Sequence, residues 1–180
     1  MDQRGMVRVS KRMSLALRHE PGRFGLVPDR AGWVPVDDLL AGLGIDRATL
    51  DTVVAGNDKQ RFAVERGSDG VERIRASQGH SIPVELDLVP CVPPDQLYHG
   101  TSRSVLASIE ATGLHRGSRH HVHLSVDVPT ARRVGARRGG EVVVLTVDAA
   151  AMARDGHLFY CSANGVWLVD AVPPGYLAGP

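Results

Sequence analysis

The sequence predicts an α+β protein built from two lobes, and three observations lead to this class. Apolar residues recur at helical spacing in the first third of the chain, where two strand-like runs follow them. Short strands and short helices alternate over the second half. Between these regions, residues 82–94 contain four prolines, which disfavour a helix and predict an extended connector. We therefore expect a first lobe at residues 1–82, a linker at 83–95 and a second lobe at 96–180.

The first lobe is expected to begin with helices. Apolar side chains in residues 9–17 recur at helical spacing, with Ser10 as a plausible cap, and this helix should end before Pro21. A second helix is predicted over residues 36–43, ended by Gly44, and a third should begin near Asp46.

A hairpin should follow these helices. Residues 61–65 and 71–75 have strand character and flank the turn sequence Ser-Asp-Gly at 68–70. Three helices and a two-stranded hairpin describe a winged-helix module. Because such a module binds nucleic acid in some proteins and is a plain scaffold in others, the fold alone assigns no function.

The second lobe should contain a mixed, mainly antiparallel sheet. Strands are predicted at residues 97–101, 122–125, 141–147, 159–160 and 165–169, with connections too short for a doubly wound parallel sheet. Asp127 and Pro129 should open a helix between the second and third of these strands. Apart from Thr146, the run at 142–147 is apolar, which is typical of a strand buried on both faces.

Composition restricts the class of protein. The 180 residues carry 21 Lys and Arg against 20 Asp and Glu, a net charge of +1 that argues against non-specific coating of long nucleic acid. Lys11 and Lys59 are the only lysines, so nearly all positive charge is guanidinium, which suits phosphate recognition. Cys91 and Cys161 lack metal-ligand spacing. With no signal-peptide core and no membrane-length apolar run, we expect a cytoplasmic protein without membrane contact.

Histidines gather in one segment. Residues 118–125, Ser-Arg-His-His-Val-His-Leu-Ser, hold three of the eight histidines, and His-Gly-Thr at 99–101 ends an earlier strand. Imidazole and guanidinium groups beside a permissive glycine suit a phosphorylated sugar nucleotide; ordinary surface histidines are the alternative. Because the run supplies at most two ligands at metal-binding spacing, we expect no metal site.

Three other clusters are open to two interpretations each. Arg18 and His19 close the first helix, where cations complement the helix dipole or hold a phosphate. Lys59 and Arg61 are either solvated charges of a loop or a phosphate contact. Arginines at 132–133 and 137–138 form a solvated helix face or assist in holding RNA. The Walker loop, the dinucleotide fingerprint and the nucleophile elbow are absent from the sequence.

Taken together, these pieces resemble the RNA 2′-phosphotransferase family of the KptA type. The similarity extends over nearly the whole chain and keeps the family's order. The matching segments are Leu-Arg-His at 17–19, Gly-Trp-Val at 32–34, residues 57–62, Ile-Arg-Ala at 74–76, Gln-Gly-His-Ser at 78–81, His-Gly-Thr at 99–101, residues 119–125 and Asn-Gly-Val-Trp-Leu at 164–168.

The resemblance implies roles for individual residues. The family's catalytic set corresponds to Arg18, His19, Arg61 and Arg119. The NAD⁺-binding set corresponds to His99, Gly100, Thr101, His123, Ser125, Asn164 and Val166. Lys59 matches a residue that contacts RNA phosphate.

The resemblance also implies a winged-helix-like first lobe, an ADP-ribosyltransferase-like second lobe and a reaction. An internal RNA 2′-phosphate is transferred to NAD⁺, which gives 2′-OH RNA, nicotinamide and ADP-ribose 1″,2″-cyclic phosphate. We expect a monomer whose partners are this RNA and NAD⁺. Two alternatives stay open: an NAD-dependent ADP-ribosyltransferase that modifies terminal phosphates of nucleic acids, and a non-catalytic RNA-binding module.

Overall fold

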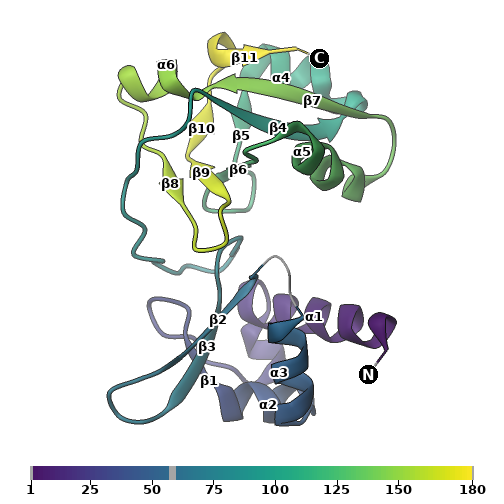
Figure 1. Cartoon of the computed structure of the whole chain (residues 1–180), viewed down its shortest axis with the longest axis vertical. Helices are drawn as coiled ribbons and strands as arrows, with labels where there is room; N and C mark the ends of the chain where they lie inside the picture. Colours follow the sequence, from purple (N-terminus) through teal and green to yellow (C-terminus); the bar gives the residue numbers. More distant parts are fainter. Residues whose placement is uncertain (1, 57–59, 180) are drawn as a thin grey trace. The chain divides into compact units, whose positions relative to one another are not determined.

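The chain divides into two compact units, residues 1–87 and 88–180. A computed structural model describes residues 2–56 and 60–179 (Figure 1). Helices and antiparallel sheets occur together in it, which confirms the α+β class. Within the described residues, no helix is long and apolar enough to cross a membrane.

The first unit contains the predicted helices and hairpin. Its elements are α1 (Gln3–Arg18), a 3₁₀ turn (Pro21–Phe24), β1 (Val34–Pro35), α2 (Val36–Leu43), α3 (Arg47–Ala55), β2 (Phe62–Arg66) and β3 (Glu72–Ala76). The strands form an antiparallel sheet in the order β1-β3-β2. The sequence did not predict β1, since its two residues are too few to show a period.

Helix α1 begins earlier than the sequence predicted. Its cap is Asp2, whose carboxylate accepts from the backbone N–H of Gly5 at 2.8 Å, and Ser10 lies in the middle of the helix. The prediction of Ser10 as cap was wrong because residues 3–8 have few apolar side chains to mark a helix, although Gly5 is buried. The caps of α2 and α3 agree with expectation: Gly44 ends α2 at φ 61°, and Asp46 begins α3.

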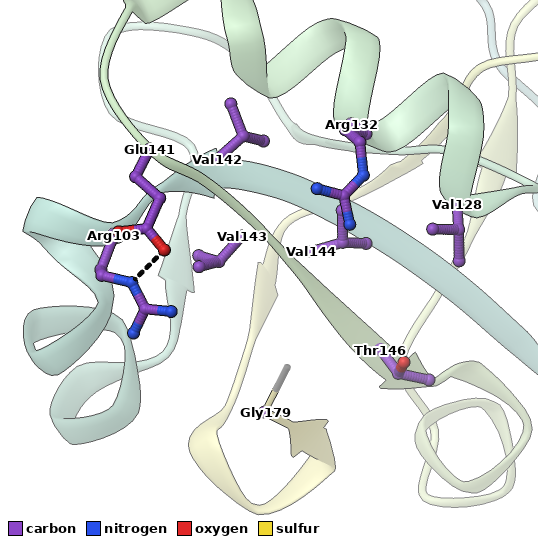
Figure 2. Close-up of a pocket in the computed structure, with 9 residues that line it drawn as sticks. All are labelled: Arg103, Val128, Arg132, Glu141, Val142, Val143, Val144, Thr146 and Gly179. Atoms are coloured by element: carbon purple, nitrogen blue, oxygen red, sulfur yellow. Dashed lines mark ion pairs between the residues drawn. The ribbon is translucent and has the colours of Figure 1, made fainter.

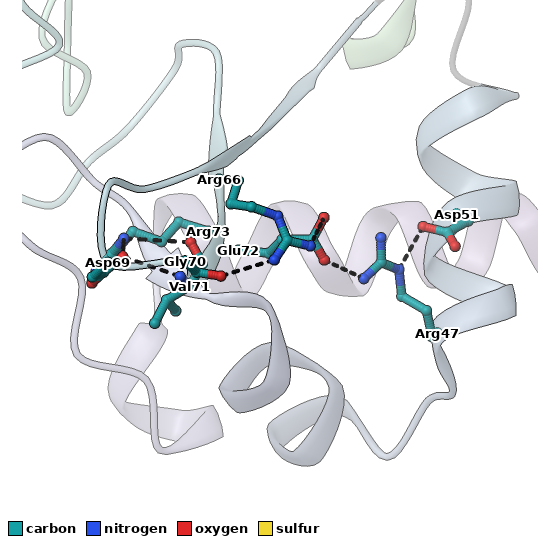
Figure 3. A network of polar contacts seen from close by, with 8 residues as sticks. All are labelled: Arg47, Asp51, Arg66, Asp69, Gly70, Val71, Glu72 and Arg73. Atoms are coloured by element: carbon teal, nitrogen blue, oxygen red, sulfur yellow. Dashed lines mark hydrogen bonds and ion pairs between the residues drawn. The ribbon is translucent and has the colours of Figure 1, made fainter.

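Polar contacts tie α3 to the hairpin (Figure 3). Arg47 bonds Asp51 on its own helix at 2.8 Å and Glu72 of β3 at 2.5 Å. Asp69 in the turn pairs with Arg73, which holds the pKa of Asp69 well below its usual range. Because these side chains are solvent-exposed, the hydrophobic core beneath them contributes far more to stability than the ion pairs do.

The second unit contains short strands in antiparallel sheets. Its strands are β4 (Gln96–Ser102), β5 (Leu114–His115), β6 (Val122–Leu124), β7 (Val142–Asp148), β8 (Tyr160–Cys161), β9 (Trp167–Val169), β10 (Ala171–Val172) and β11 (Leu177–Ala178). They form the sheets β11-β7-β4, β6-β9-β8 and β10-β5. Every strand pair within 60–179 is antiparallel, in agreement with the mainly antiparallel prediction, and no parallel pair accompanies them there.

Three α-helices accompany these strands: α4 (Leu106–Thr112), α5 (Val128–Gly135) and α6 (Ala149–Arg154). Asp127 caps α5, as predicted, and its carboxylate accepts from the backbone N–H of Thr130 at 2.6 Å. Helix α5 lies against β4 and β7 (Figure 1). Residues of β7 alternate between buried and half-buried, so the prediction of a strand buried on both faces was wrong. The reason is that α5 has only 8 residues and covers the second face incompletely.

Candidate active site

In the first unit, Arg18 lies beside Arg61. Their chain neighbours Leu17 and Phe62 are buried in one hydrophobic core, which brings the end of α1 next to the start of β2. Nη2 of Arg18 lies 3.5 Å from the backbone carbonyl oxygen of Arg61. That carbonyl also accepts the backbone N–H of Ser77 at 2.9 Å. The Arg18 guanidinium therefore reaches the backbone of Arg61, which is 43 positions away in the sequence.

His19 is joined to Ser81, which the sequence analysis did not select. Nδ1 of His19 lies 2.9 Å from Oγ of Ser81, and the backbone N–H of Ser81 donates to the carbonyl of Arg18 at 3.0 Å. The Ser81 hydroxyl lies 3.5 Å from the same carbonyl, which can only accept. If the hydroxyl donates there, Nδ1 of His19 carries a proton and donates to Ser81.

The segment that carries Ser81 has restricted conformations. Gly79 adopts φ 87°, a left-handed conformation that favours glycine, and it directly precedes the buried His80. The four-residue motif Gln-Gly-His-Ser was the signal that could have pointed to Ser81, because it lies just before the linker and far from any predicted helix. Lys59, the predicted RNA contact, lies outside the described residues.

In the second unit, two sheets separate beside the predicted NAD⁺ residues. A single antiparallel bridge joins Tyr98 of β4 to Ser125, just after β6, through two backbone hydrogen bonds of 2.8 Å. Apart from this bridge, β4 pairs with β7 along its whole length, and β6 pairs with β9. His99, which follows Tyr98, and His123, two positions before Ser125, thus lie next to the single bridge between β4 and β6.

His99, His123 and Arg119 meet at this point. Nδ1 of His99 lies 3.1 Å from the carbonyl oxygen of His123, and Nη1 of Arg119 lies 3.2 Å from Nδ1 of His123. A carbonyl only accepts and a guanidinium only donates, so His99 is protonated at Nδ1 and His123 is neutral with its proton on Nε2. If His99 is also neutral, its Nε2 accepts while Nε2 of His123 donates. The geometry assigns opposite hydrogen-bonding roles to two neighbouring imidazoles.

Gly100 and Thr101 have different surroundings from His99. A Cβ atom at Gly100 would overlap the carbonyl oxygen of Ala131 in α5, so glycine here permits the close approach of helix and strand. Gly135 is its counterpart, since a Cβ there would lie 2.7 Å from the carbonyl carbon of Gly100. Thr101 is buried. Both residues therefore have a packing role that the sequence did not predict.

Asn164 and Val166 belong to the turn between β8 and β9, which is organised by Ser162. The buried Ser162 hydroxyl lies 2.7 Å from Oδ1 of Asn164 and 3.1 Å from the carbonyl oxygen of Val166, and it accepts the Val166 N–H at 3.2 Å. Because β6 and β9 pair with Leu124 opposite Trp167, Val166 continues toward the register position of Ser125. Ser162 stands two positions before the turn sequence Asn-Gly at 164–165, and this spacing could have identified it as a residue that stabilises the turn.

The histidine run divides between two environments. His121 packs edge-on against Tyr160 with ring centroids 5.5 Å apart, and its Nε2 is 3.7 Å from Oδ1 of Asp170. Burial lowers the pKa of His121, and Asp170 opposes this shift only partly. His121 is thus packed against Tyr160 beside Asp170, whereas His123 faces Arg119. Within residues 2–56 and 60–179, no three His, Cys, Asp or Glu side chains converge as a metal site would require.

A pocket of about 390 Å³ lies elsewhere on the second unit (Figure 2). Its lining comes from β7, α5 and their flanks: Arg103, Val128, Arg132, Glu141, Val142, Val143, Val144, Thr146 and Gly179. Val144 pairs with Gly100 on the α5 face of the sheet, whereas His99 pairs with Leu145 on the opposite face. None of the predicted site residues lines this pocket, and we assign the candidate site to the histidine side of the sheet.

Comparison with known proteins identifies the family. The family model described as RNA 2′-phosphotransferase, Tpt1 / KptA family, matches residues 4–171. The chain belongs to this family. It is 57% identical to a probable RNA 2′-phosphotransferase of Streptomyces griseus, with 98% of each chain covered. It is 56% identical to one of Streptomyces coelicolor, with 100% of this chain and 98% of the relative covered. Identity to the probable RNA 2′-phosphotransferase of Nostoc punctiforme is 50%, with 98% of each covered.

Proposed function

We propose that this protein transfers an internal RNA 2′-phosphate to NAD⁺. The products would be RNA with a 2′-hydroxyl, nicotinamide and ADP-ribose 1″,2″-cyclic phosphate. Family membership supports the phosphotransfer, and the Arg119–His123–His99 arrangement is the observation that supports NAD⁺ as the acceptor.

The first unit would bind the phosphate as a winged-helix-like lobe. A phosphomonoester carries a charge of about −1.5 to −2 at neutral pH and offers three acceptor oxygens. Arg18, whose guanidinium reaches the backbone of Arg61, and Arg61 itself would supply guanidinium forks that match these oxygens, and His19 would supply an imidazole. Correct alignment of a bound nucleophile is worth about 7–11 kcal/mol in favourable cases.

The second unit would bind NAD⁺ as an ADP-ribosyltransferase-like lobe. Nicotinamide ribose has hydroxyl groups that both donate and accept, and a neutral His99 offers an acceptor beside the donor of His123. NAD⁺ supplies a ribose carbon with nicotinamide as leaving group. Arg119 lies 3.2 Å from His123 and would bring a permanent positive charge next to the histidines proposed to bind NAD⁺.

The test is an assay with NAD⁺ and an RNA oligonucleotide that carries one internal 2′-phosphate. We expect release of nicotinamide and of the cyclic phosphate product, together with conversion of the RNA to its 2′-hydroxyl form. A parallel reaction uses an oligonucleotide with only a 5′-phosphate. Stable ADP-ribosylated 5′ ends, with untouched 2′-phosphate RNA, would show the terminal-phosphate transferase instead. RNA binding without any NAD⁺-dependent product would show a binding module.

A further inference from the structure

We infer that the exposed face of α1 binds backbone phosphates of the single-stranded RNA that flanks the 2′-phosphate. This inference rests on the proposed function for the end of the helix that carries Arg18. It adds a second contact surface, made by Arg4, Arg8 and Lys11, which is separate from the residues assigned to phosphate transfer.

The position of these cations follows from helical geometry. Arg4, Arg8 and Lys11 are separated by four and three residues, so they lie on one face of α1, and all three are exposed. The buried residues Val9 and Met13 lie on the opposite face. At 100° per residue, Arg18 falls on the same side as the three cations. A row of positive charge therefore extends along the helix to the proposed phosphate-binding arginine.

The length of the row fits an extended nucleic acid. From Arg4 to Arg18 the helix rises by about 21 Å, at about 1.5 Å per residue. Phosphates along one nucleic acid strand are only about 3.4 Å apart along the axis when bases stack, so the row reaches past several nucleotides. Proteins that bind single strands without sequence preference use positive surfaces of this kind to follow the backbone.

The arrangement is unfavourable for an isolated helix. Helix α1 contains five cationic residues, Arg4, Arg8, Lys11, Arg12 and Arg18, and no Asp or Glu. Arg4 lies in the first turn, where the helix dipole disfavours positive charge, and like charges at spacings of three and four residues repel. Only Asp2, the cap, offers a nearby negative charge on this element. An anionic partner would relieve this repulsion.

Neighbouring residues do not neutralise the three cations in the structure. Among residues 2–56 and 60–179, no ion pair joins Arg4, Arg8 or Lys11 to a carboxylate, whereas Arg47 and Arg73 in the same unit each have an acidic partner. Arg12 differs from the three, because its Nη2 donates to the carbonyl of Leu43 at 2.9 Å. We therefore assign the RNA contact to Arg4, Arg8 and Lys11.

Helix α5 provides a matched control. Arg132 and Arg133 lie in its last turn, where positive charge is favoured by the helix dipole, and Arg137 follows directly. All three are exposed, so their replacement by glutamine removes the same charge from the other unit. Local helix energetics explain these cations without a ligand.

The experiment compares Arg4→Gln/Arg8→Gln/Lys11→Gln with Arg132→Gln/Arg133→Gln/Arg137→Gln on two substrates. One is a trinucleotide with the 2′-phosphate at its centre, and the other has six further nucleotides on each side. We expect the α1 variant to lower kcat/KM on the long substrate about tenfold and to leave the trinucleotide rate unchanged. The α5 variant should leave both unchanged. An equal loss on both substrates, or an equal loss in both variants, overturns the inference.

Salt dependence gives a second measurement, which uses only the wild-type protein. The slope of log K against log salt is about −0.7 per neutralised phosphate for single strands. Three contacts therefore make the wild-type protein lose about 18-fold more affinity for the long RNA than for the trinucleotide between 50 and 200 mM salt. Equal slopes for the two lengths would refute the contact surface.

Binding to RNA without a 2′-phosphate separates this inference from the proposed function. Absence of turnover on both substrates, with length-dependent binding that the α1 variant loses, would contradict the phosphotransfer and leave the α1 surface intact. Turnover on the trinucleotide without any effect of RNA length would support the phosphotransfer and contradict the α1 surface.

Discussion

The two units hold their candidate site residues in different ways. In the first unit, Arg18 and Arg61 are fixed by the ends of elements whose next residues, Leu17 and Phe62, are buried. In the second unit, His99 and His123 lie where β4 and β6 stop pairing, and their contacts run from imidazole to carbonyl and to guanidinium. The arginines of the first unit are positioned by the hydrophobic core that buries their chain neighbours. The histidines of the second unit are positioned by the single bridge between β4 and β6.

This difference predicts different failures. Long guanidinium side chains on a packed core can be removed without disturbing the backbone, so their loss should affect chemistry more than folding. The histidine site depends on the mutual placement of β4, β6 and α5, so a change in that packing should affect both folding and the site. Four predictions test this contrast, beginning with the largest expected effect.

Arg18→Ala and Arg61→Ala should each lower kcat/KM for the 2′-phosphate RNA by about 10- to 150-fold. A lost charge-assisted contact costs about 1.5–3 kcal/mol, and each 1.4 kcal/mol is a factor of ten. Arg18→Lys should also be poor because an ammonium group cannot replace the planar fork. Steady-state rates with varied RNA measure this effect. Arg23→Ala, an exposed arginine paired with Glu20, is the control; normal turnover in Arg18→Ala would remove its assigned role.

Gly100→Ala should destabilise the second unit by about 1–3 kcal/mol, as expected when a methyl group is forced into a packed contact. The added Cβ collides with the backbone carbonyl of Ala131, and backbone cannot rotate away as a side chain can. Thermal or urea unfolding measures the change. Gly175→Ala in the same unit has no atom within 4 Å of the new Cβ and should unfold like the wild type. Equal stability of the two variants would contradict the close helix–strand contact.

His123→Ala should raise the KM for NAD⁺ by up to about tenfold and leave RNA binding unchanged. The change removes the donor beside His99 and the acceptor of Arg119, and a single hydrogen bond contributes about 0.5–1.5 kcal/mol. Initial rates at varied NAD⁺ and a separate RNA-binding assay distinguish the two ligands. The exposed His115→Ala is the control. A loss confined to RNA binding would place His123 with the phosphate and not with NAD⁺.

His121→Gln should give the smallest effect, a weaker loss of stability at mildly acidic pH. Burial lowers the pKa of His121 in the folded protein below the usual 6.5. The unfolded chain then binds more protons as the pH falls below 6.5, so stability decreases until the pH passes the folded pKa. The measurement is the change in Tm between pH 7.5 and 5.5, with His115→Gln as control. An unchanged pH dependence in His121→Gln would contradict the lowered pKa.

Much of the fold was predictable because local signals agreed with it. Asp46 and Asp127 act as caps, Gly44 ends α2, and the Ser-Asp-Gly turn joins β2 to β3. The sequence missed β1, β5, β10, β11 and α6, and it placed the start of α1 too late. These elements are short or have a weak apolar period, and their position depends on neighbours that are distant in the chain.

The candidate site was predictable mainly as a set of residue types and family motifs. Ser81 and Ser162 escaped selection because a serine beside many others has no distinctive pattern, although each contacts a selected residue. The choice of His123 over His121 as the partner of Arg119 also followed only from the structure.

The sequence by itself determined the α+β class, most helix ends and the family, because caps, turns and motifs are properties of adjacent residues. Only the tertiary structure decided that Gly100 packs against α5, that β4 and β6 separate beside His99, and that Ser81 reaches His19. Those contacts join residues far apart in the chain. Their geometry is set by burial of the surrounding core, which no local pattern records.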